Sequence, residues 1–209
     1  MTPPTPPTAA ATGDLQKIDV KFGVRCGDDL DWDVLLGVFG RWRLEAGEEI
    51  VDLADYAHVP HGPSCILISK RWQFGIDFTR GAGLGRAAGW CGLMFSSRKG
   101  LDGDVASRVR AVTRAALERS SQLLAEPELS GRAEVLVGEL DVVFNDRLLF
   151  ANTDASDARA RPAVAALARA LYGAAEVEIA READPGRRLG YALRASPAPT
   201  AAGALSRLA

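Results

Sequence analysis

The stretch from Glu49 to Lys99 constrains the fold most, because its apolar residues follow strand patterns almost throughout. In its middle, bulky apolar residues alternate with polar or small ones, which predicts a strand with one buried and one solvent-facing side. These apolar residues are Trp72, Phe74, Ile76 and Phe78. The nearly continuous apolar run at 64–69 predicts a strand covered on both faces. With further strands expected at 50–56 and 89–97, this stretch is predicted to form the main β-sheet.

Both flanks of this stretch combine strand and helix patterns. Before it, we expect a half-buried strand at 18–25, then a helix capped by Asp29 or Asp31 and ended by Gly47. After it, the longest helix is expected over 104–126. A second unit follows, with strands at 133–144 and 147–151, a helix from about Asp157, and strands at 176–180 and 189–195. The sequence therefore predicts an α+β fold with a mostly antiparallel β-sheet or sheets and three main helices.

The two ends of the chain differ in composition from its middle. Residues 1–15 are rich in Pro, Thr and Ala, which bury too little apolar surface to offset the entropy of ordering, so we expect a disordered tail. Residues 196–209 are similar and are expected to form a flexible tail, in which Leu205 and Leu208 dock only weakly. Between the tails we expect a single α+β domain over 16–195, with 16–127 and 131–195 as an alternative pair of subdomains.

The overall charge gives no sign of a nucleic-acid or membrane partner. The formal net charge is −2, and no apolar run approaches the roughly 18 residues that span a bilayer. The N-terminal segment has neither a basic region nor an apolar core, so we do not expect a secretory signal. The three cysteines, Cys26, Cys65 and Cys91, form no CxxC pair and fit reduced thiols. We therefore expect a soluble, cytoplasmic protein.

One constellation of metal-ligating residue types occurs at the loop that follows residue 56. Asp52, Asp55, His58 and His61 are evenly spaced by three, and Cys65 follows closely. In an extended segment successive members of such a series point to opposite sides, and the prolines exclude a helix. A loop that folds back would bring His58 and His61 together, with Asp55 or Cys65 as a third metal ligand. The alternatives are that these side chains bind loop backbone, or that a histidine activates Cys65 as a nucleophile.

Two further patterns were weighed for binding. The glycines of residues 81–85 follow G-x-G-x-G and precede a strand, so they favour a hairpin loop over a dinucleotide site. A basic, aromatic-bearing region offers phosphate contacts and base stacking, which is how proteins hold single-stranded nucleic acid. That region comprises Lys70, Arg71, Trp72, Arg80, Arg86, Arg98 and Lys99. Solvated strand edges are commonly basic too, so nucleic acid is kept only as an alternative partner.

The runs VDLADYAHVPHGP (Val51–Pro63) and FNDRLLFANT (Phe144–Thr153) resemble the two signature patches of a family of uncharacterised bacterial proteins. The resemblance covers nearly everything between the tails. It implies a shared α+β fold and no assigned activity, cofactor or catalytic residues. Members typically carry a Gly-His-Glu-like segment after the central strand, where this chain has Ser69-Lys70-Arg71-Trp72. This departure argues against a catalytic His or Glu there.

Together these patterns predict a function only in broad terms. No catalytic residue and no cofactor are predicted, because no constellation combines the required residue types with the required spacing. We expect a non-catalytic protein that acts through protein–protein interaction or self-association, with a protein partner or a second copy of the chain. The alternatives are a metal-binding, ligand-binding or catalytic role for the loop that holds His58 and His61, and single-stranded nucleic-acid binding.

Overall fold

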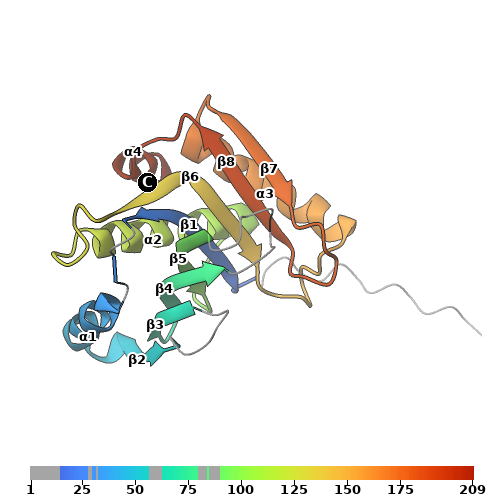
Figure 1. The fold of residues 1–209 in the computed structure, drawn as a ribbon. Helices are drawn as coiled ribbons and strands as arrows, with labels where there is room; N and C mark the ends of the chain where they lie inside the picture. Colours follow the sequence, from blue (N-terminus) through green and yellow to red (C-terminus); the bar gives the residue numbers. More distant parts are fainter. Residues whose placement is uncertain (1–14, 28–29, 32, 57–62, 80–83, 85–89) are drawn as a thin grey trace, which may run out of the picture.

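The computed structural model in Figure 1 describes residues 15–27, 30–31, 33–56, 63–79, 84 and 90–209. The strands are β1 (Ile18–Cys26), β2 (Ile50–Asp55), β3 (Pro63–Ser69), β4 (Trp72–Thr79), β5 (Trp90–Ser97), β6 (Ala133–Phe144), β7 (Glu176–Arg181) and β8 (Gly190–Ser196). The helices are α1 (Val34–Ala46), α2 (Val105–Leu124), α3 (Asp154–Tyr172) and α4 (Ala201–Leu208), with a 3₁₀ turn at Gly47–Glu49.

All eight strands belong to one antiparallel sheet, in the order β2-β3-β4-β5-β1-β6-β8-β7. Strand β1 lies inside the sheet, between β5 and β6, so the strands of both halves of the chain join at it. Two of the predicted strands match closely, since β6 has the expected bounds and β4 shows the expected alternation. The predicted α+β class with a mostly antiparallel sheet is confirmed. The ranges 16–127 and 131–195 share this one sheet.

The apolar face of the sheet packs against the helices (Figure 1). Val20 lies opposite Phe95 of β5 and Val142 of β6, and all three side chains belong to one buried core cluster. On this face α1 adds Phe39, whose ring centroid lies 6.0 Å from that of Phe74. The four helices of the described chain lie on this face and leave the opposite face uncovered by helices.

The long helix α2 spans the middle of the core. Asp104 caps it, because the Asp104 side chain accepts a hydrogen bond from the Ser107 amide at 2.8 Å. At its other end, Glu126 accepts a hydrogen bond from the Trp42 indole of α1 at 2.7 Å. The two helices are thereby fixed relative to each other on the same side of the sheet.

The structure corrects three local predictions. Residues 196–209 are not a flexible tail, because Thr200 caps α4, whose Ala204 and Leu208 are buried. The range 147–151 is not a strand: residues 147–149 form a turn, in which the Asp146 side chain accepts hydrogen bonds from the backbone amides of residues 148 and 149, and Ala151 forms only an isolated bridge with Arg188. Helix α3 begins earlier than expected because Thr153 caps it.

The predicted N-terminal tail is outside the described residues except for its last member. Residues 1–14 are not described, and Leu15 is fully buried. The Leu15 carbonyl accepts a hydrogen bond from the Arg108 guanidinium of α2 at 3.0 Å, which fixes the start of the described chain to the core. Across the described helices, none combines the length and the apolar character needed to cross a membrane.

Candidate binding pocket on the open face of the sheet

The open face of the sheet carries charged residues at its centre. Because side chains alternate along β1, Asp19 and Lys21 point away from the helix-covered core. Lys21 lies opposite Met94 of β5 on one side and Asp141 of β6 on the other. Although no helix covers this face, Asp19, Lys21 and Asp141 are each less than 9% exposed. Three ionisable residues are therefore buried side by side on the face that lacks a helical layer.

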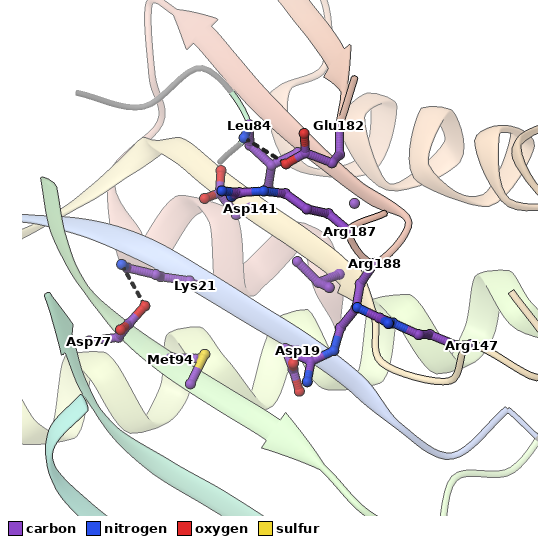
Figure 2. Close-up of a pocket in the computed structure, with 12 residues that line it drawn as sticks. Asp19, Lys21, Asp77, Leu84, Met94, Asp141, Arg147, Glu182, Arg187 and Arg188 are labelled. Atoms are coloured by element: carbon purple, nitrogen blue, oxygen red, sulfur yellow. Dashed lines mark hydrogen bonds and ion pairs between the residues drawn. The ribbon is translucent and has the colours of Figure 1, made fainter. Parts of the chain in front are cut away.

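These residues form the floor of a pocket of about 480 Å³, shown in Figure 2. Apolar contacts come from Leu84, Met94 and Val143. The rest of the lining is charged apart from Gly190, and its charged members are Asp19, Lys21, Asp77, Asp141, Arg147, Glu182, Arg187 and Arg188. The arginines are exposed and form the rim. Pockets that combine apolar walls with a few convergent polar groups are the usual binding sites for small molecules.

Lys21 is held by an ion pair on the pocket floor. Its ammonium lies 2.8 Å from the Asp77 carboxylate and 4.3 Å from the centroid of the Trp90 ring. The Trp90 indole donates in turn to Glu139 at 2.6 Å. Burial lowers the pKa of Lys21, and the charges of Asp77 and Asp141 act in the opposite direction. The lysine is thus positioned by partners from β4, β5 and β6.

Asp19 is the least satisfied charged group of the floor. Its Oδ2 accepts a hydrogen bond from the Asn145 amide at 2.9 Å, whereas its Oδ1 is buried and accepts none within the described part of the chain. Burial raises the pKa of Asp19, and the Ser96 hydroxyl, Arg188 and Asn145 only partly offset this effect. A buried oxygen without a donor is costly to the fold, which marks Asp19 as a candidate ligand contact.

The connection between β7 and β8 supplies most of the rim. Arg187 lies 3.6 Å from Asp184 in an ion pair, and Glu182 accepts a hydrogen bond from the Leu84 amide at 3.2 Å. Arg147 comes from the β6–α3 connection and donates to the Gly186 carbonyl at 3.1 Å. Figure 2 shows these arginines entering from the side opposite Lys21 and Asp77.

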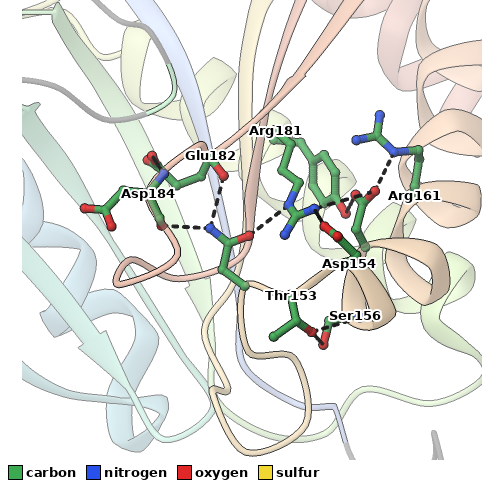
Figure 3. Close-up of polar contacts among 10 residues, drawn as sticks. Thr153, Asp154, Ser156, Arg161, Arg181, Glu182 and Asp184 are labelled. Atoms are coloured by element: carbon green, nitrogen blue, oxygen red, sulfur yellow. Dashed lines mark hydrogen bonds and ion pairs between the residues drawn. The ribbon is translucent and has the colours of Figure 1, made fainter.

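A polar network fixes this connection to the start of α3 (Figure 3). The Asn152 side-chain amide donates to the carbonyls of Glu182 and Asp184, at 3.0 and 2.9 Å. Its oxygen accepts from Arg181, which also forms an ion pair with Asp154 at 2.7 Å. Because Asn152 is buried and bonded at both ends, the connection that carries Arg187 and Arg188 is well defined in position.

The neighbouring carboxylate Asp157 completes this network. It accepts a hydrogen bond from the Tyr191 hydroxyl at 2.7 Å and one from Arg161 at 3.0 Å. Although burial acts to raise it, these bonds hold the pKa of Asp157 below its usual value. Burial and the Asp157 contact raise the pKa of Tyr191. These groups satisfy one another, so we interpret them as support for the rim.

The metal alternative is only partly within reach of the structure. His58 and His61 lie outside the described residues. Asp55 and Cys65 are directly opposite each other across β2 and β3. Cys65 is buried, and burial followed by the Asp55 charge raises its pKa to about 12, which disfavours the thiolate that binds metals. In the described ranges no group of three or more His, Cys, Asp or Glu residues is arranged to hold a metal ion.

The nucleic-acid alternative loses its stacking residue. Trp72 is 8% exposed, stacks on Phe95 at 5.5 Å between ring centroids, and is covered by the Arg119 guanidinium. It faces the helices and cannot present a free ring to a base. Lys70 and Arg71 form ion pairs with Glu48 and Glu49, while Arg80 and Arg86 lie outside the described residues.

Sequence reasoning missed the pocket because its residues are far apart along the chain. The half-buried strand predicted at 18–25 implies that its polar residues Asp19 and Lys21 face solvent, and they are buried instead. Arg147 was assigned to a strand that the structure replaces with a turn. The sequence does show two charged residues on one side of the β1 strand. They indicate a buried polar site only once the strand order places β1 in the middle of the sheet.

Comparisons of the chain with protein-family models, with curated proteins and with solved structures found no match. The resemblance of Val51–Pro63 and Phe144–Thr153 to a bacterial family thus stays a prediction. A function therefore has to be inferred from the chemistry of the pocket.

Proposed function

We propose that the protein binds a small polar molecule in the pocket on the open face of the sheet. The observation that carries this proposal is Asp19, a buried carboxyl that lines the pocket and whose Oδ1 accepts no hydrogen bond from the described chain. A ligand that fills the pocket and contacts the Asp19 side chain would offset part of the cost of burying this incompletely bonded carboxyl. We favour ligand binding over catalysis as the role of this pocket, because the Lys21 ammonium already forms an ion pair with the Asp77 carboxylate.

The apolar wall of the pocket supports the same role. Leu84, Met94 and Val143 lie beside the charged floor, so a bound molecule would bury apolar as well as polar surface. The volume of about 480 Å³ is within the range of small-molecule sites.

A ligand-observed NMR screen of a diverse fragment library, with ¹⁵N spectra to locate each binder, tests the proposal. Val143→Phe fills the pocket and should abolish binding of the fragments that shift amides around Asp19. Ile68→Phe is the matched control, because Ile68 is also partly exposed on the open face of a strand but does not line the pocket. A library without a single binder at this pocket would contradict the proposal, as would binders that are indifferent to Val143→Phe.

Self-association is the second candidate function, and it keeps the prediction made from the sequence. Three of the four exposed large apolar side chains of the described residues lie at the corner formed by α1 and β2. They are Leu44 at 85%, Val51 at 46% and Tyr56 at 39% exposed. β2 is also an edge of the sheet, where backbone groups can pair with a second copy of the chain. A protein partner, a cytoplasmic location and a bacterial family stay predictions from the sequence.

Sedimentation velocity over a range of protein concentrations tests this second candidate. The wild type should show a reversible dimer, and Leu44→Glu with Val51→Glu should shift it to monomer. Leu148→Glu is the control, because Leu148 is 98% exposed but lies outside this corner. A wild-type protein that is monomeric at every concentration, or an equal loss with Leu148→Glu, would overturn it.

A further inference from the structure

The charges of the pocket can be divided into those that have an ion-pair partner and those that do not. Lys21 is paired with Asp77, and Arg187 with Asp184. Glu182 accepts hydrogen bonds from two backbone amides, those of Leu84 and Asp184. Lys21 and Arg187 are therefore already paired with carboxylates of the protein, whereas the neutral amides leave the charge of Glu182 in place.

Arg147 and Arg188 are the cations that remain. Arg147 donates to a carbonyl, and neither residue forms an ion pair within the described chain. They come from different connections, β6–α3 and β7–β8, and both line the same pocket (Figure 2). Two guanidinium groups that converge from separate segments without carboxylate partners are a recognisable arrangement for binding an oxyanion.

Asp19 is the residue of the pocket floor on which Arg188 acts. Arg188 acts on Asp19 electrostatically, although the two form no ion pair. Burial raises the pKa of the Asp19 carboxyl, which lessens its repulsion of an anion nearby. The groups that act on Asp19 are Ser96, Arg188, Asn145 and Asp77. Of these, only Asp77 favours the neutral form, and it is already paired with Lys21.

We infer that the ligand bears a carboxylate or phosphate that Arg147 and Arg188 bind, with an apolar part against Leu84, Met94 and Val143. This inference rests on the proposed function, since it names the chemical class of the molecule that the pocket takes. A cationic ligand would meet three arginines at the rim. The arrangement therefore favours an anion over the amine that an ionised Asp19 alone would attract.

Four probes that share a butyl chain separate these possibilities: butyrate, butyl phosphate, butylammonium and butan-1-ol. Binding is measured by titration with ¹⁵N spectra of the full chain. Butyrate or butyl phosphate should shift amides around the pocket, and the preferred one of the two identifies the headgroup. Butylammonium and butan-1-ol should bind about tenfold more weakly or not at all, because they lack charge-assisted bonds to the arginines.

Two substitutions then test the roles of the named side chains. Arg188→Gln should weaken binding of the anion by about tenfold. Arg98→Gln changes an exposed arginine away from the pocket and should leave binding unchanged. Asp19→Asn removes an ionisable carboxyl and leaves both arginines in place, so anion binding should persist within a factor of about three. For an amine ligand, by contrast, Asp19→Asn would abolish binding.

The outcomes distinguish the inference from the proposed function. Pocket binding of butylammonium that Asp19→Asn removes would overturn the inference and leave the proposed function standing. Failure of both anions, while other fragments from the screen still bind at Val143, would do the same. Failure of all fragments at the pocket would overturn both.

Discussion

The two faces of the sheet are built by the same strands and differ sharply in what they bury. On the helix-covered face, β1 contributes Val20 and Phe22 to a continuous apolar core. On the open face, the same strand contributes Asp19 and Lys21, which are almost as inaccessible to solvent. Burial of apolar surface stabilises a fold, whereas burial of charge opposes folding unless each charge is paired. The comparison indicates that the stability of the protein resides mainly in one face.

The open face thus holds groups that folding alone does not favour. The attraction between Lys21 and Asp77 offsets part of the cost of removing both charges from water. The buried Oδ1 of Asp19 accepts no hydrogen bond within the described chain, so the cost of its burial is not offset in this way. Proteins retain such groups at sites where activity requires them, at a cost in stability. Substitutions on the two faces should therefore differ in size, in sign and in pH dependence.

The largest effect should come from the helix-covered face. Phe74 is fully buried and contacts the Phe39 ring of α1, so Phe74→Ala leaves a cavity in the core. We expect a loss of about 3–5 kcal/mol in the free energy of unfolding, measured by urea denaturation. Met94→Ala, on the open face of the neighbouring strand, should cost only about 1 kcal/mol because the pocket is already open to solvent there. Equal losses would show that the two faces contribute equally to stability.

The next effect should come from the charge pair on the pocket floor. Lys21→Met leaves the Asp77 and Asp141 carboxylates without their central cation, and we expect a loss of about 2–3 kcal/mol at neutral pH. Asp77→Asn in the same chain should return part of it, because it removes one of the uncompensated charges. A double-mutant cycle by urea denaturation measures this coupling. Strictly additive effects would mean that the pair contributes nothing as a pair.

Much of the helix-covered face could be predicted from sequence, and the pocket could not. The alternation in 72–78 and the apolar pattern of 133–144 identify β4 and β6, because periodicity is a local property of the chain. That β1 lies between β5 and β6 is a long-range pairing that no local pattern encodes. The burial of Asp19 and Lys21 depends on this pairing. For the same reason Asp77 and Asp141, in two different strands, were not recognised as neighbours of Lys21.

The turn that carries Arg147 shows a different limit. The apolar residues at 148–150 favour a strand, but the Asp146 side chain binds the following amides and holds a turn. For the C-terminal segment the prediction was wrong in the opposite sense, because a flexible tail was expected and a helix formed. Its small residues give a weak helical pattern, and its buried residues are Ala204 and Leu208. Both cases were decided by tertiary packing and by short-range side-chain bonds.

Asp19→Asn should have a smaller effect of opposite sign. The folded-state pKa of Asp19 lies above its usual value of 3.8, so between these two pKa values the folded protein binds more protons than the unfolded chain. Stability contributed by Asp19 therefore falls as pH rises through this window. Asparagine cannot ionise, so we expect the variant to be more stable by about 1 kcal/mol at neutral pH, with the gain disappearing as pH falls towards 3.8.

Thermal denaturation at a series of pH values measures this gain. Asp102→Asn serves as the control, because Asp102 is exposed and away from the pocket, and its substitution should leave stability unchanged at every pH. A destabilised Asp19→Asn protein at neutral pH would show that ionised Asp19 is well compensated in the fold. In that case the main argument for a ligand at this atom would be lost.

The smallest effect should come from a charge pair on the same open face but outside the pocket. Glu178 of β7 lies 3.5 Å from Arg194 of β8, with side chains 64% and 38% exposed. Because solvent screens such a pair, Glu178→Gln should change the free energy of unfolding by no more than about 0.5 kcal/mol. Urea denaturation beside the Lys21→Met protein makes the comparison direct. A loss as large as that of Lys21→Met would mean that charge pairs stabilise the whole open face. A negligible loss would mean that only the charges of the pocket have a large effect on stability, as expected for charges that serve ligand binding.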